Sequence, residues 1–312
     1  MNPRILIVGD GSDGRPNRLG RSLRRRGAMV VATSLAAIAF DTSRPSGLAI
    51  PGFGEHLPDA VLVRSVAAGS FEAITRRLGV LHALGRLSVP VWNSAQAIER
   101  CVDKSMTTFL LQKAGLPTPP TFVVESRMAA EDISARELAR GPLVAKPLFG
   151  AQGRGIRMIR SLDDLPAAEE LNDVYYLQHY VSRAGPPFRD FRIFVCAGRA
   201  VAMMGRRGED WITNVNRGAV PERISGYDED RLSALAVAAA NAVGADFAGV
   251  DIVPAADGSL LVLEVNSMPA WSGLQSVAAV DIADAIADAL LKTVADRAEA
   301  SRPYRFASPA NS

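Results

Sequence analysis

The sequence predicts a mixed α/β (α+β) fold in which a small parallel sheet is followed by antiparallel hairpins. Residues 1–93 alternate short apolar runs with helical segments, which is typical of a parallel sheet with crossover helices. Later in the chain, pairs of apolar runs flank short glycine-containing segments, which favours antiparallel pairing. A chain of 312 residues with 48% hydrophobic content is long enough for two or three packed units.

The composition excludes several classes of protein. A net charge of +2 requires no polyanionic partner, and Cys101 and Cys196 are too few for a disulfide framework or a thiolate metal site. The start of the chain lacks the apolar core of a secretory signal, and no run of about 18 apolar residues occurs. We therefore expect a soluble, cytoplasmic protein with no membrane or nucleic-acid partner.

Four short apolar runs in the first part of the chain predict strands, with helices between and after them. They are Arg4–Gly9, Val30–Thr33, Ala60–Arg64 and Val89–Trp92. The first helix carries arginines on its outer side and Leu19 and Leu23 on its inner side. Such a basic helix suits nucleic acid, but it holds no aromatic residue and acids elsewhere balance its charge, which favours a solvated face.

Two helices are expected directly after this unit. Ser94 is the predicted N-cap of the first, over residues 95–100. Asp103 and Lys104 open the second, which runs to Lys113 and ends at the following Ala-Gly pair.

A glycine-rich hairpin follows and predicts a phosphate site. The run Pro142–Pro147 is a strand that contains Lys146, and Ile156–Ile159 is the returning strand. The loop between them holds Gly150, Gly153 and Gly155, whose backbone N–H groups are suited to phosphate oxygens. Lys146 supplies a point charge to the same phosphates. Glycine hairpins also occur without ligands, and the acidic hairpin described next decides in favour of a ligand.

Two carboxylates interrupt neighbouring apolar strands near the C-terminus. The runs Phe247–Val253 and Leu260–Asn266 flank Asp257-Gly258, which predicts a two-residue hairpin turn. Counting back from that turn places Pro254 opposite Leu261 and Asp251 opposite Glu264. Residues directly opposed in this way have Cβ atoms roughly 4.5–5.5 Å apart. Like charges at that separation are destabilising unless a cation lies between them.

The amide of Asn266 lies on the same predicted face as Glu264, because strand side chains alternate. Leu261, Leu263 and Val265 are then expected on the opposite face. Two carboxylates and an amide oxygen form an all-oxygen set that suits Mg²⁺ carrying substrate phosphates. The alternative is a surface hairpin with two solvated acids, which is less favoured because both strands are otherwise apolar.

The run Val174–Val181 predicts a strand whose end forms an adenine slot. Backbone groups at such an end can bind the edge of a purine while apolar side chains cover its faces. His179 lies in this run. A lone histidine on an apolar strand is more often structural than catalytic, so no acid–base role is assigned to it.

A second hairpin, Asp190–Arg207, turns at Ala197–Arg199. Asp190 and Arg192 share one face, while Phe191, Ile193 and Val195 share the other. The returning arm ends in Arg206 and Arg207, and a polar loop then carries Asn214 and Arg217. Arginines beside a metal-bound triphosphate would neutralise charge on a transferred phosphoryl group. Solvated arginines at strand ends are the alternative. A helix over Asp228–Val243 precedes the acidic hairpin.

Seven of these segments, in this order, resemble the motifs of the ATP-grasp ligases. They are Asp103-Lys104, Lys146-Pro-Leu with its glycine-rich loop, Gln178-His-Tyr-Val181, Asp190-x-Arg192, Asn214-x-x-Arg217-Gly, Gly249-Val-Asp251 and Glu264-Val-Asn266. The chain is most similar to the RimK-type branch, which attaches glutamate to carboxylates, and there to the tetrahydromethanopterin:α-L-glutamate ligases. The resemblance covers residues from about 93 to 290.

The resemblance implies an ATP-grasp fold with a pre-grasp domain. The expected divisions are an N-terminal α/β domain (1–93), a central subdomain with the glycine-rich loop (94–181), a C-terminal subdomain with the metal site (182–300) and a flexible tail (301–312).

It also implies roles for individual residues. Those for ATP are Lys104, Lys146, Gly150, Gln152, Gly153, Gly155, Gln178, His179, Tyr180, Val181, Asp190, Ile212, Thr213 and Asn214. Those for one or two Mg²⁺ (or Mn²⁺) ions are Asp251, Glu264 and Asn266. Arg192, Arg206 and Arg217 are candidates for the acceptor carboxylate or the acyl-phosphate. Relatives often carry an acid at the position of His179, which leaves only the side-chain contact there in doubt.

The implied reaction joins L-glutamate to a carboxylate through an acyl-phosphate, with ATP as phosphoryl donor. The expected acceptor is a tetrahydromethanopterin-type pterin, for which Trp92, Trp211 and Trp271 are possible platforms. One alternative is a RimK-like ligase that extends the C-terminus of a ribosomal or other protein. The other is a regulator that binds a nucleotide or nucleic acid without turnover, supported only by the arginine-rich helix.

Overall fold

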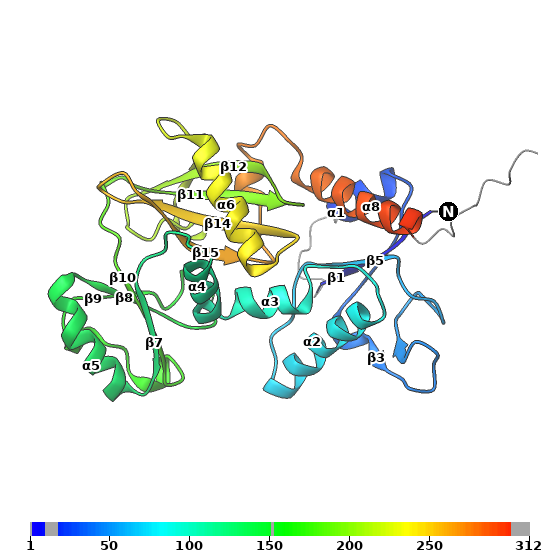
Figure 1. Cartoon of the computed structure of the whole chain (residues 1–312), viewed down its shortest axis with the longest axis horizontal. Helices are drawn as coiled ribbons and strands as arrows, with labels where there is room; N and C mark the ends of the chain where they lie inside the picture. The colour runs from blue at the N-terminus through cyan, green and yellow to red at the C-terminus, as the bar shows by residue number, and fades with distance from the viewer. Residues whose placement is uncertain (1, 10–17, 151–152, 301–312) are drawn as a thin grey trace, which may run out of the picture. The chain divides into compact units, whose positions relative to one another are not determined.

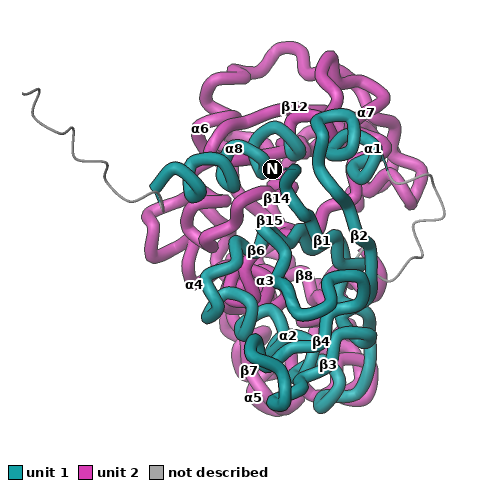
Figure 2. The backbone as a smooth tube through the Cα atoms, turned by 90° about the vertical axis from the view of Figure 1, so that its right-hand side faces the viewer, with its two compact units in different colours: residues 1–92, 286–312 teal, residues 93–285 magenta. Residues whose placement is uncertain are grey.

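The computed structural model describes residues 2–9, 18–150 and 153–300 (Figure 1). They form two compact units (Figure 2). Unit 1 contains the residues up to 92 together with those from 286 onward, and unit 2 contains residues 93–285. Each unit has its own hydrophobic interior.

Unit 1 is built on a parallel sheet. Its elements are β1 (Arg4–Val8), α1 (Arg18–Arg25), β2 (Met29–Thr33), η1 (Leu35–Ala37), β3 (Ala39–Phe40), β4 (Leu48–Ala49), β5 (Ala60–Val63), α2 (Phe71–Arg86) and β6 (Val91–Trp92), and most of α8 (Ile282–Ala300) belongs here too. The strand order is β2-β1-β5-β6, all parallel, as predicted. Leu19 and Leu23 of α1 are buried, also as predicted.

One predicted feature of unit 1 is wrong. A helix was expected between β2 and β5, but the described chain there forms the short η1 turn and the β3–β4 hairpin. The segment contains Pro45, Pro51 and Pro58, which remove backbone donors and restrict the preceding residues. An α-helix cannot run through them.

Unit 2 holds two antiparallel sheets. The first has the order β7-β10-β8-β9 and the second the order β13-β12-β11-β14-β15. The strands are β7 (Thr121–Glu125), β8 (Leu143–Lys146), β9 (Arg157–Ile159), β10 (Val174–His179), β11 (Phe188–Cys196), β12 (Arg199–Gly208), β13 (Val220–Glu222), β14 (Phe247–Pro254) and β15 (Leu260–Asn266). The helices are α3 (Ala95–Val102), α4 (Lys104–Lys113), α5 (Arg127–Glu137), α6 (Glu229–Val243) and α7 (Ser272–Gln275). The 3-10 turns are η2 (Leu138–Arg140), η3 (Leu162–Asp164), η4 (Ala168–Glu170) and η5 (Val215–Arg217).

Each of these sheets is covered by helices on one face. In the first, Ala130 of α5 packs with Leu143, Ala145, Tyr175 and Leu177. In the second, α6 contributes Leu232, Ala236, Ala239, Ala240 and Val243 to a core with alternate residues of β11, β14 and β15. Phe191, Ile193 and Val195 point into this core, which confirms their predicted face. The opposite faces carry the polar side chains of the pocket, among them Lys146, Gln178 and Asp251, together with apolar ones such as Phe194.

The helix starts of unit 2 follow the sequence signals. The Ser94 side chain accepts from the N–H of Ala97, and the Asp103 side chain accepts from the N–H groups of Ser105 and Met106. These bonds satisfy N–H groups that have no partner inside the helix. Lys104 is thereby fixed as the first residue of α4.

The β14–β15 hairpin differs from the prediction in one respect. Its turn is longer than two residues: Ala255 bonds to Ser259, and Gly258 adopts a φ of 80°. This places Pro254 opposite Leu260 instead of Leu261. A β-bulge then restores the predicted register, so that Asp251 is paired with Glu264.

The bulge also changes which residues face the core. The side chains buried under α6 are Leu260, Val262 and Val265, whereas Leu261 and Leu263 are only half-buried. The expectation that Leu261 and Leu263 share the core face with Val265 is therefore wrong. An extra residue in one strand reverses the alternation on one side of the bulge.

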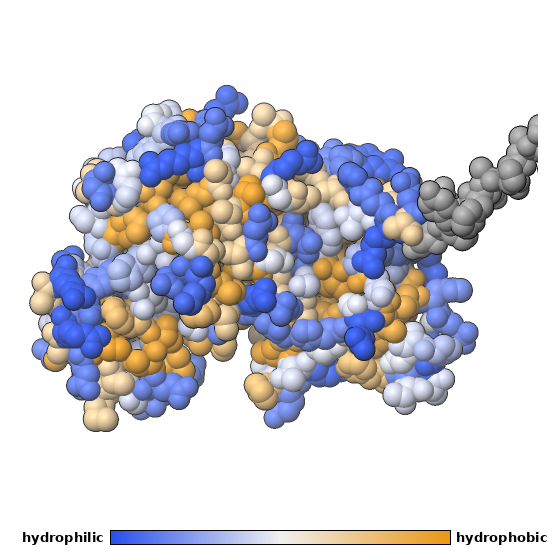
Figure 3. All heavy atoms as spheres, viewed as in Figure 1, coloured by the Kyte–Doolittle hydropathy of each residue, from blue (hydrophilic) through white to orange (hydrophobic). Residues whose placement is uncertain are grey.

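The surface carries both hydrophilic and hydrophobic residues, as is usual for a globular protein. Figure 3 shows hydrophilic residues along the outer side of α5, with hydrophobic areas between hydrophilic ones elsewhere on that face. Among the helices that the structure describes, none is both long and apolar enough to cross a membrane.

Candidate active site

A pocket in unit 2 is lined by the polar faces of both antiparallel sheets. From the first sheet it takes Val144, Lys146 and Gln178, and from the second Asp251 and Glu264 among others. The alternation of side chains along a strand explains why these residues line the pocket, because Leu143, Ala145 and Leu177 point the other way into the core under α5. The glycine-rich loop and the loop after β12 complete the wall.

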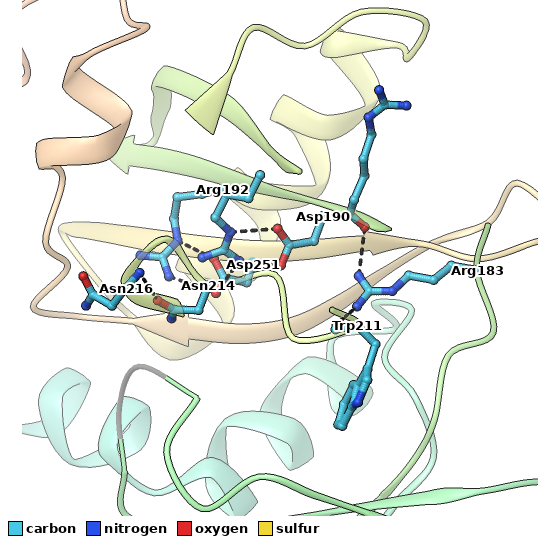
Figure 4. Close-up of polar contacts among 9 residues, drawn as sticks. Arg183, Asp190, Arg192, Trp211, Asn214, Asn216 and Asp251 are labelled. Atoms are coloured by element: carbon cyan, nitrogen blue, oxygen red, sulfur yellow. Dashed lines mark hydrogen bonds and ion pairs between the residues drawn. The ribbon is translucent and has the colours of Figure 1, made fainter. Parts of the chain in front are cut away.

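Four charged side chains meet at one side of this pocket (Figure 4). The Arg206 guanidinium donates to both oxygens of Asp190, at 2.7 and 2.6 Å, and lies 3.1 Å from Asp251. Arg192 donates to both oxygens of Asp251, one of them at 2.9 Å. Gly249 leaves room for this arrangement, because a Cβ there would lie 2.9 Å from the Arg192 side chain.

Asp251 and Arg206 keep their charges although they are buried. Burial raises the pKa of Asp251, but Arg192 and Arg206 outweigh that effect and hold its pKa below the usual value. Burial likewise lowers the pKa of Arg206, and Asp190 and Asp251 more than reverse this and raise it. A buried guanidinium with two carboxylate partners is well compensated, whereas loss of either partner is costly.

The acidic pair fits a hard divalent cation. No group of three or more His, Cys, Asp or Glu suited to a metal occurs within the described chain, and the carboxylates that line the pocket are those of Asp190, Asp251 and Glu264. The Glu264 carboxylate makes no hydrogen bond to any described residue, which leaves its oxygens open. Asp251 offers about four acceptor positions, of which the arginines take three. Asn266 accepts from the N–H of Met268. Such an open oxygen set suits Mg²⁺ completed by phosphate oxygens.

Two lysines approach the pocket from different elements. Lys104 donates to the carbonyl oxygens of Leu148 and Gly150, at 2.9 and 3.2 Å, and so holds the start of the glycine-rich loop. Lys146 donates to the side chain of Gln178 at 2.6 Å. Burial lowers the pKa of both, that of Lys146 to about 8, while the nearby charge of Glu264 acts in the opposite direction.

The end of β10 forms the apolar part of the pocket. The backbone N–H groups of His179 and Tyr180 bond to Pro120 and Pro142, whereas that of Val181 has no partner among the described residues. Tyr180 packs edge-on against Trp211, with ring centroids 5.7 Å apart. His179 contacts the buried Glu137 at 3.2 Å, which agrees with a structural role.

The glycine-rich loop contacts the loop after β12 closely. A Cβ on Gly153 would lie 2.9 Å from Ile212 and 3.3 Å from Arg217, and Gly153 also has a positive φ of 71°. Arg217 in turn donates to the Gly153 carbonyl at 3.4 Å. Only glycine fits this contact without displacement.

The structure brings most of the expected site residues together. Those lining the pocket are Lys104, Lys146, Gly150, Gly153, Gln178, His179, Tyr180, Val181, Asp190, Arg206, Ile212, Thr213, Asn214, Asp251 and Glu264. Gly155, Arg192, Arg217 and Asn266 lie behind or beside these and do not line it. Gln152 lies outside the described residues. Asn214 caps the η5 turn (Val215–Arg217) through its side chain, which accepts from the N–H of Asn216.

Seven lining residues were not anticipated: Val144, Pro147, Arg154, Ile156, Arg183, Val253 and Leu263, while Trp211 was expected only as a platform for the acceptor. Val144 and Val253 stand two residues from Lys146 and Asp251, so strand alternation alone indicates them. Leu263 reaches the pocket through the bulge, for which the sequence has no marker. Arg183 donates to the carbonyls of Arg189, at 2.8 Å, and Trp211, and nothing in the sequence pointed to it (Figure 4).

Comparisons with known proteins agree with this architecture. The family model of the RimK-like ATP-grasp domain matches residues 101–290. A tetrahydromethanopterin:alpha-L-glutamate ligase of Methanocaldococcus jannaschii is 36% identical over 247 residues, covering 76% of this chain and 80% of that protein. The protein of the same name from Methanococcus maripaludis is 36% identical over 212 residues, covering 65% and 70%.

Solved structures are similar over nearly the whole chain. The ATP-grasp ligase PsnB in complex with a minimal precursor superposes with a TM-score of 0.71 at 22% identity, covering 94% of this chain and 99% of that one. A second structure of PsnB, with precursor, Mg and ADP, gives 0.68 at 23% identity, covering 93% and 98%. At this level of identity the similarity concerns the fold.

Proposed function

Because the chain belongs to the RimK-like ATP-grasp family and is an ATP-dependent carboxylate–amine ligase, we propose that it adds L-glutamate to a tetrahydromethanopterin-type pterin. The observation that carries this proposal is the single pocket shared by Lys146, Asp251 and Glu264. Relatives named for that reaction, 36% identical to this chain, support the choice of amine and acceptor.

In this proposal the apolar end of the pocket holds adenine. The N–H of Val181, which has no partner in the described part of the chain, is proposed to bind the edge of the base. Tyr180, Trp211 and Leu263 supply apolar surface for its faces. The phosphates then extend toward Lys146 and Lys104, and the glycine-rich loop offers backbone N–H groups over them. Asp251, Glu264 and Asn266 would hold Mg²⁺, which supplies charge neutralisation at the phosphates.

The reaction proceeds in two steps. An oxygen of the acceptor carboxylate attacks the γ-phosphorus of ATP, the bond to the bridging oxygen breaks, and ADP leaves. The amine of L-glutamate then attacks the acyl carbon, phosphate departs with the electrons of the carbon–oxygen bond, and the amine loses its proton. No side-chain nucleophile is needed, so positioning and cationic charge account for the catalysis.

The three arginines take different parts in this scheme. Arg206 is committed to Asp190 and Asp251 inside the buried cluster, so its contribution is to orient these acids. Arg192 borders the acidic pair, and Arg217 is half-exposed beside the glycine-rich loop. Arg192 donates to both oxygens of Asp251, so it also orients an acid. Arg217, the half-exposed one of the three, is therefore the proposed contact for the acceptor carboxylate or the acyl-phosphate.

The tryptophans differ as platforms for a pterin. Trp92 is buried in unit 1, and Trp271 packs edge-on against Phe194 at 5.7 Å. Trp211 lines the pocket but already packs against Tyr180. Trp271 lies a short distance after the end of β15, so Trp271 and Trp211 are the two proposed platforms for the acceptor.

The test is a reconstitution with purified protein, ATP, Mg²⁺ and L-glutamate. A tetrahydropterin that bears a free carboxylate is one acceptor, and a peptide with a free C-terminal carboxylate is the other. We expect ADP release that requires both glutamate and the pterin, and a product heavier by one glutamyl residue in mass spectrometry. Turnover with the peptide and not with the pterin would show that the acceptor is a protein C-terminus. Nucleotide binding without turnover of either acceptor would contradict the ligase activity.

A further inference from the structure

A series of hydrogen bonds runs from the Lys146 side chain to the backbone carbonyl of Lys104. Of the residues between them, only Gln178 has been given a role so far, that of its backbone beside adenine. Lys146 donates to the Gln178 side-chain oxygen at 2.6 Å. The Gln178 amide nitrogen donates to the hydroxyls of Thr121 and Tyr176, at 3.0 and 3.1 Å. Thr108 lies 2.8 Å from the same Tyr176 hydroxyl.

Strand geometry explains why these groups meet. On β10 the side chains of Tyr176 and Gln178 lie on the same face, while Tyr175 and Leu177 enter the core under α5. Lys146 of β8 is the cross-strand partner of Tyr176, and Thr121 of β7 is that of Gln178. Tyr176 and Gln178 are almost fully buried, so water does not substitute for their protein partners.

The donor and the acceptor of each hydrogen bond in this series follow from its neighbours. Thr121 donates to the Pro119 carbonyl at 2.8 Å, so its oxygen accepts from Gln178. Tyr176 accepts the second amide hydrogen of Gln178, so its own hydroxyl donates to Thr108. Thr108 then donates to the backbone carbonyl of Lys104 at 2.9 Å.

This order of donors has a consequence for Gln178. Both of its amide hydrogens are used, so rotation of the amide by 180° would turn the nitrogen toward the ammonium group of Lys146 and place two donors face to face. Only the observed orientation presents the oxygen to Lys146. The series of hydrogen bonds therefore extends from Lys146 to the first turn of α4, and each donor in it has an acceptor. In that turn, Lys104 holds the glycine-rich loop.

We propose that Gln178, Tyr176 and Thr108 are positioning residues that hold the Lys146 ammonium group and the first turn of α4 in one arrangement for the phosphates of the nucleotide. The proposal rests on the proposed function, in which Lys146 and Lys104 bind those phosphates. It assigns Gln178 a side-chain role in addition to the backbone role expected from the sequence. The Tyr176 ring also lies under Lys146, 5.6 Å from its nitrogen to the ring centroid.

The test is a double-mutant cycle on nucleotide binding, measured by calorimetry with Mg²⁺ and ATP and without acceptor. Gln178→Leu is expected to weaken binding roughly tenfold, as for loss of a hydrogen bond to a charged group. In a Lys146→Met background the same change is expected to have no effect, because Gln178 acts through the lysine. Independent, multiplying effects in the two backgrounds would overturn the proposal, since Gln178 would then act on the nucleotide itself.

Tyr176→Phe gives a second measurement, because it keeps the ring and removes only the hydroxyl. We expect nucleotide binding to weaken by about threefold to tenfold. The matched control is Tyr175→Phe, which removes the neighbouring hydroxyl, bonded at 3.0 Å to the Pro166 carbonyl on the other face. The control is expected to lower the melting temperature without changing the dissociation constant. Equal effects of the two substitutions on binding would mean that these hydrogen bonds only stabilise the fold, which would contradict the positioning role.

The experiment separates this inference from the proposed function. Absence of ATP binding by the unmodified protein would contradict the proposed function and this inference together. Normal binding by the unmodified protein with multiplying effects of Gln178 and Lys146 would contradict only the positioning role.

Discussion

Asp251 and Glu264 are direct cross-strand partners, and they face the same pocket as Lys146. Two acids in this position repel each other unless positive charge lies close by. For Asp251 that charge comes from Arg192 and Arg206, whereas Glu264 has no hydrogen-bonding partner among the described residues. The pair is therefore unequal: one acid is anchored by the fold, and the other is available to a ligand.

Glu264→Gln is expected to remove most of the activity without weakening the fold. The loss in kcat should be at least about 100-fold, since outer partners of metal ligands alone cost roughly 10–100-fold. The change in unfolding free energy should stay within about 0.5 kcal/mol, because no hydrogen bond is lost. ADP release as a function of Mg²⁺ concentration and urea denaturation measure the two effects. Glu125→Gln, at an exposed position of β7, is the control that should leave both unchanged. A fully active Glu264→Gln protein would contradict the assignment of Glu264 as a metal ligand.

Arg206→Met is expected to destabilise the protein by about 3–5 kcal/mol, because it leaves the buried Asp190 without its charge partner. Its neighbour on β12 provides the comparison. Arg207 lies 3.3 Å from Glu222 with both side chains partly exposed, so Arg207→Met should cost no more than about 1 kcal/mol. Urea denaturation of the two variants measures the difference. Similar losses would mean that the buried cluster is not the tightly coupled unit that the geometry indicates.

Nucleotide binding is expected to weaken as the pH rises through about 8, where the buried Lys146 loses its proton. The lysine is charged below this pKa, so its attraction to phosphate is present at neutral pH and declines above it. Between pH 7 and pH 9 the dissociation constant for ATP should rise by up to about tenfold. Lys146→Arg remains charged throughout and should give a flat profile. A profile of the unmodified protein as flat as that of the variant would contradict the assignment.

The same shift has the opposite sign for the stability of the unliganded protein. Between about 8 and the ordinary lysine pKa of 10.5, the folded chain binds fewer protons than the unfolded chain. The contribution of Lys146 to the unfolding free energy therefore rises with pH across this window. Comparing the pH dependence of urea denaturation with that of Lys146→Met isolates this contribution.

Gly153→Ala is expected to raise the KM for ATP several-fold, because its Cβ would lie 2.9 Å from Ile212 and separate the two loops that border the pocket. The positive φ adds about 1 kcal/mol of strain. Gly258→Ala controls for that strain, since Gly258 has a similar φ of 80° but open space around it. Steady-state kinetics measures the effect of the close contact on the KM, and thermal melting measures the effect of the backbone strain on stability. If both variants raise the KM equally, the close contact at Gly153 has no functional part.

The polar faces of the strands could be predicted from sequence because side-chain alternation is a local property. The positions of Asp190 and Arg192 opposite Phe191 and Ile193 followed from the period of two. The capping residues Ser94 and Asp103 were also readable, since a cap depends on its own first turn. The order of motifs gave the family.

What the sequence by itself determined was the content of the site: which acids, lysines and glycines occur and, outside the bulged strand β15, which face of a strand they occupy. Tertiary structure decided how they combine. The bulge that brings Leu263 into the pocket, the pairing of Arg206 with two acids, and the hydrogen-bond chain from Lys146 to α4 all depend on contacts between residues far apart in the chain. The physical reason is that alternation and capping act over a few residues, whereas the partner of a buried charge or hydroxyl is set by whichever strand the core packing places beside it.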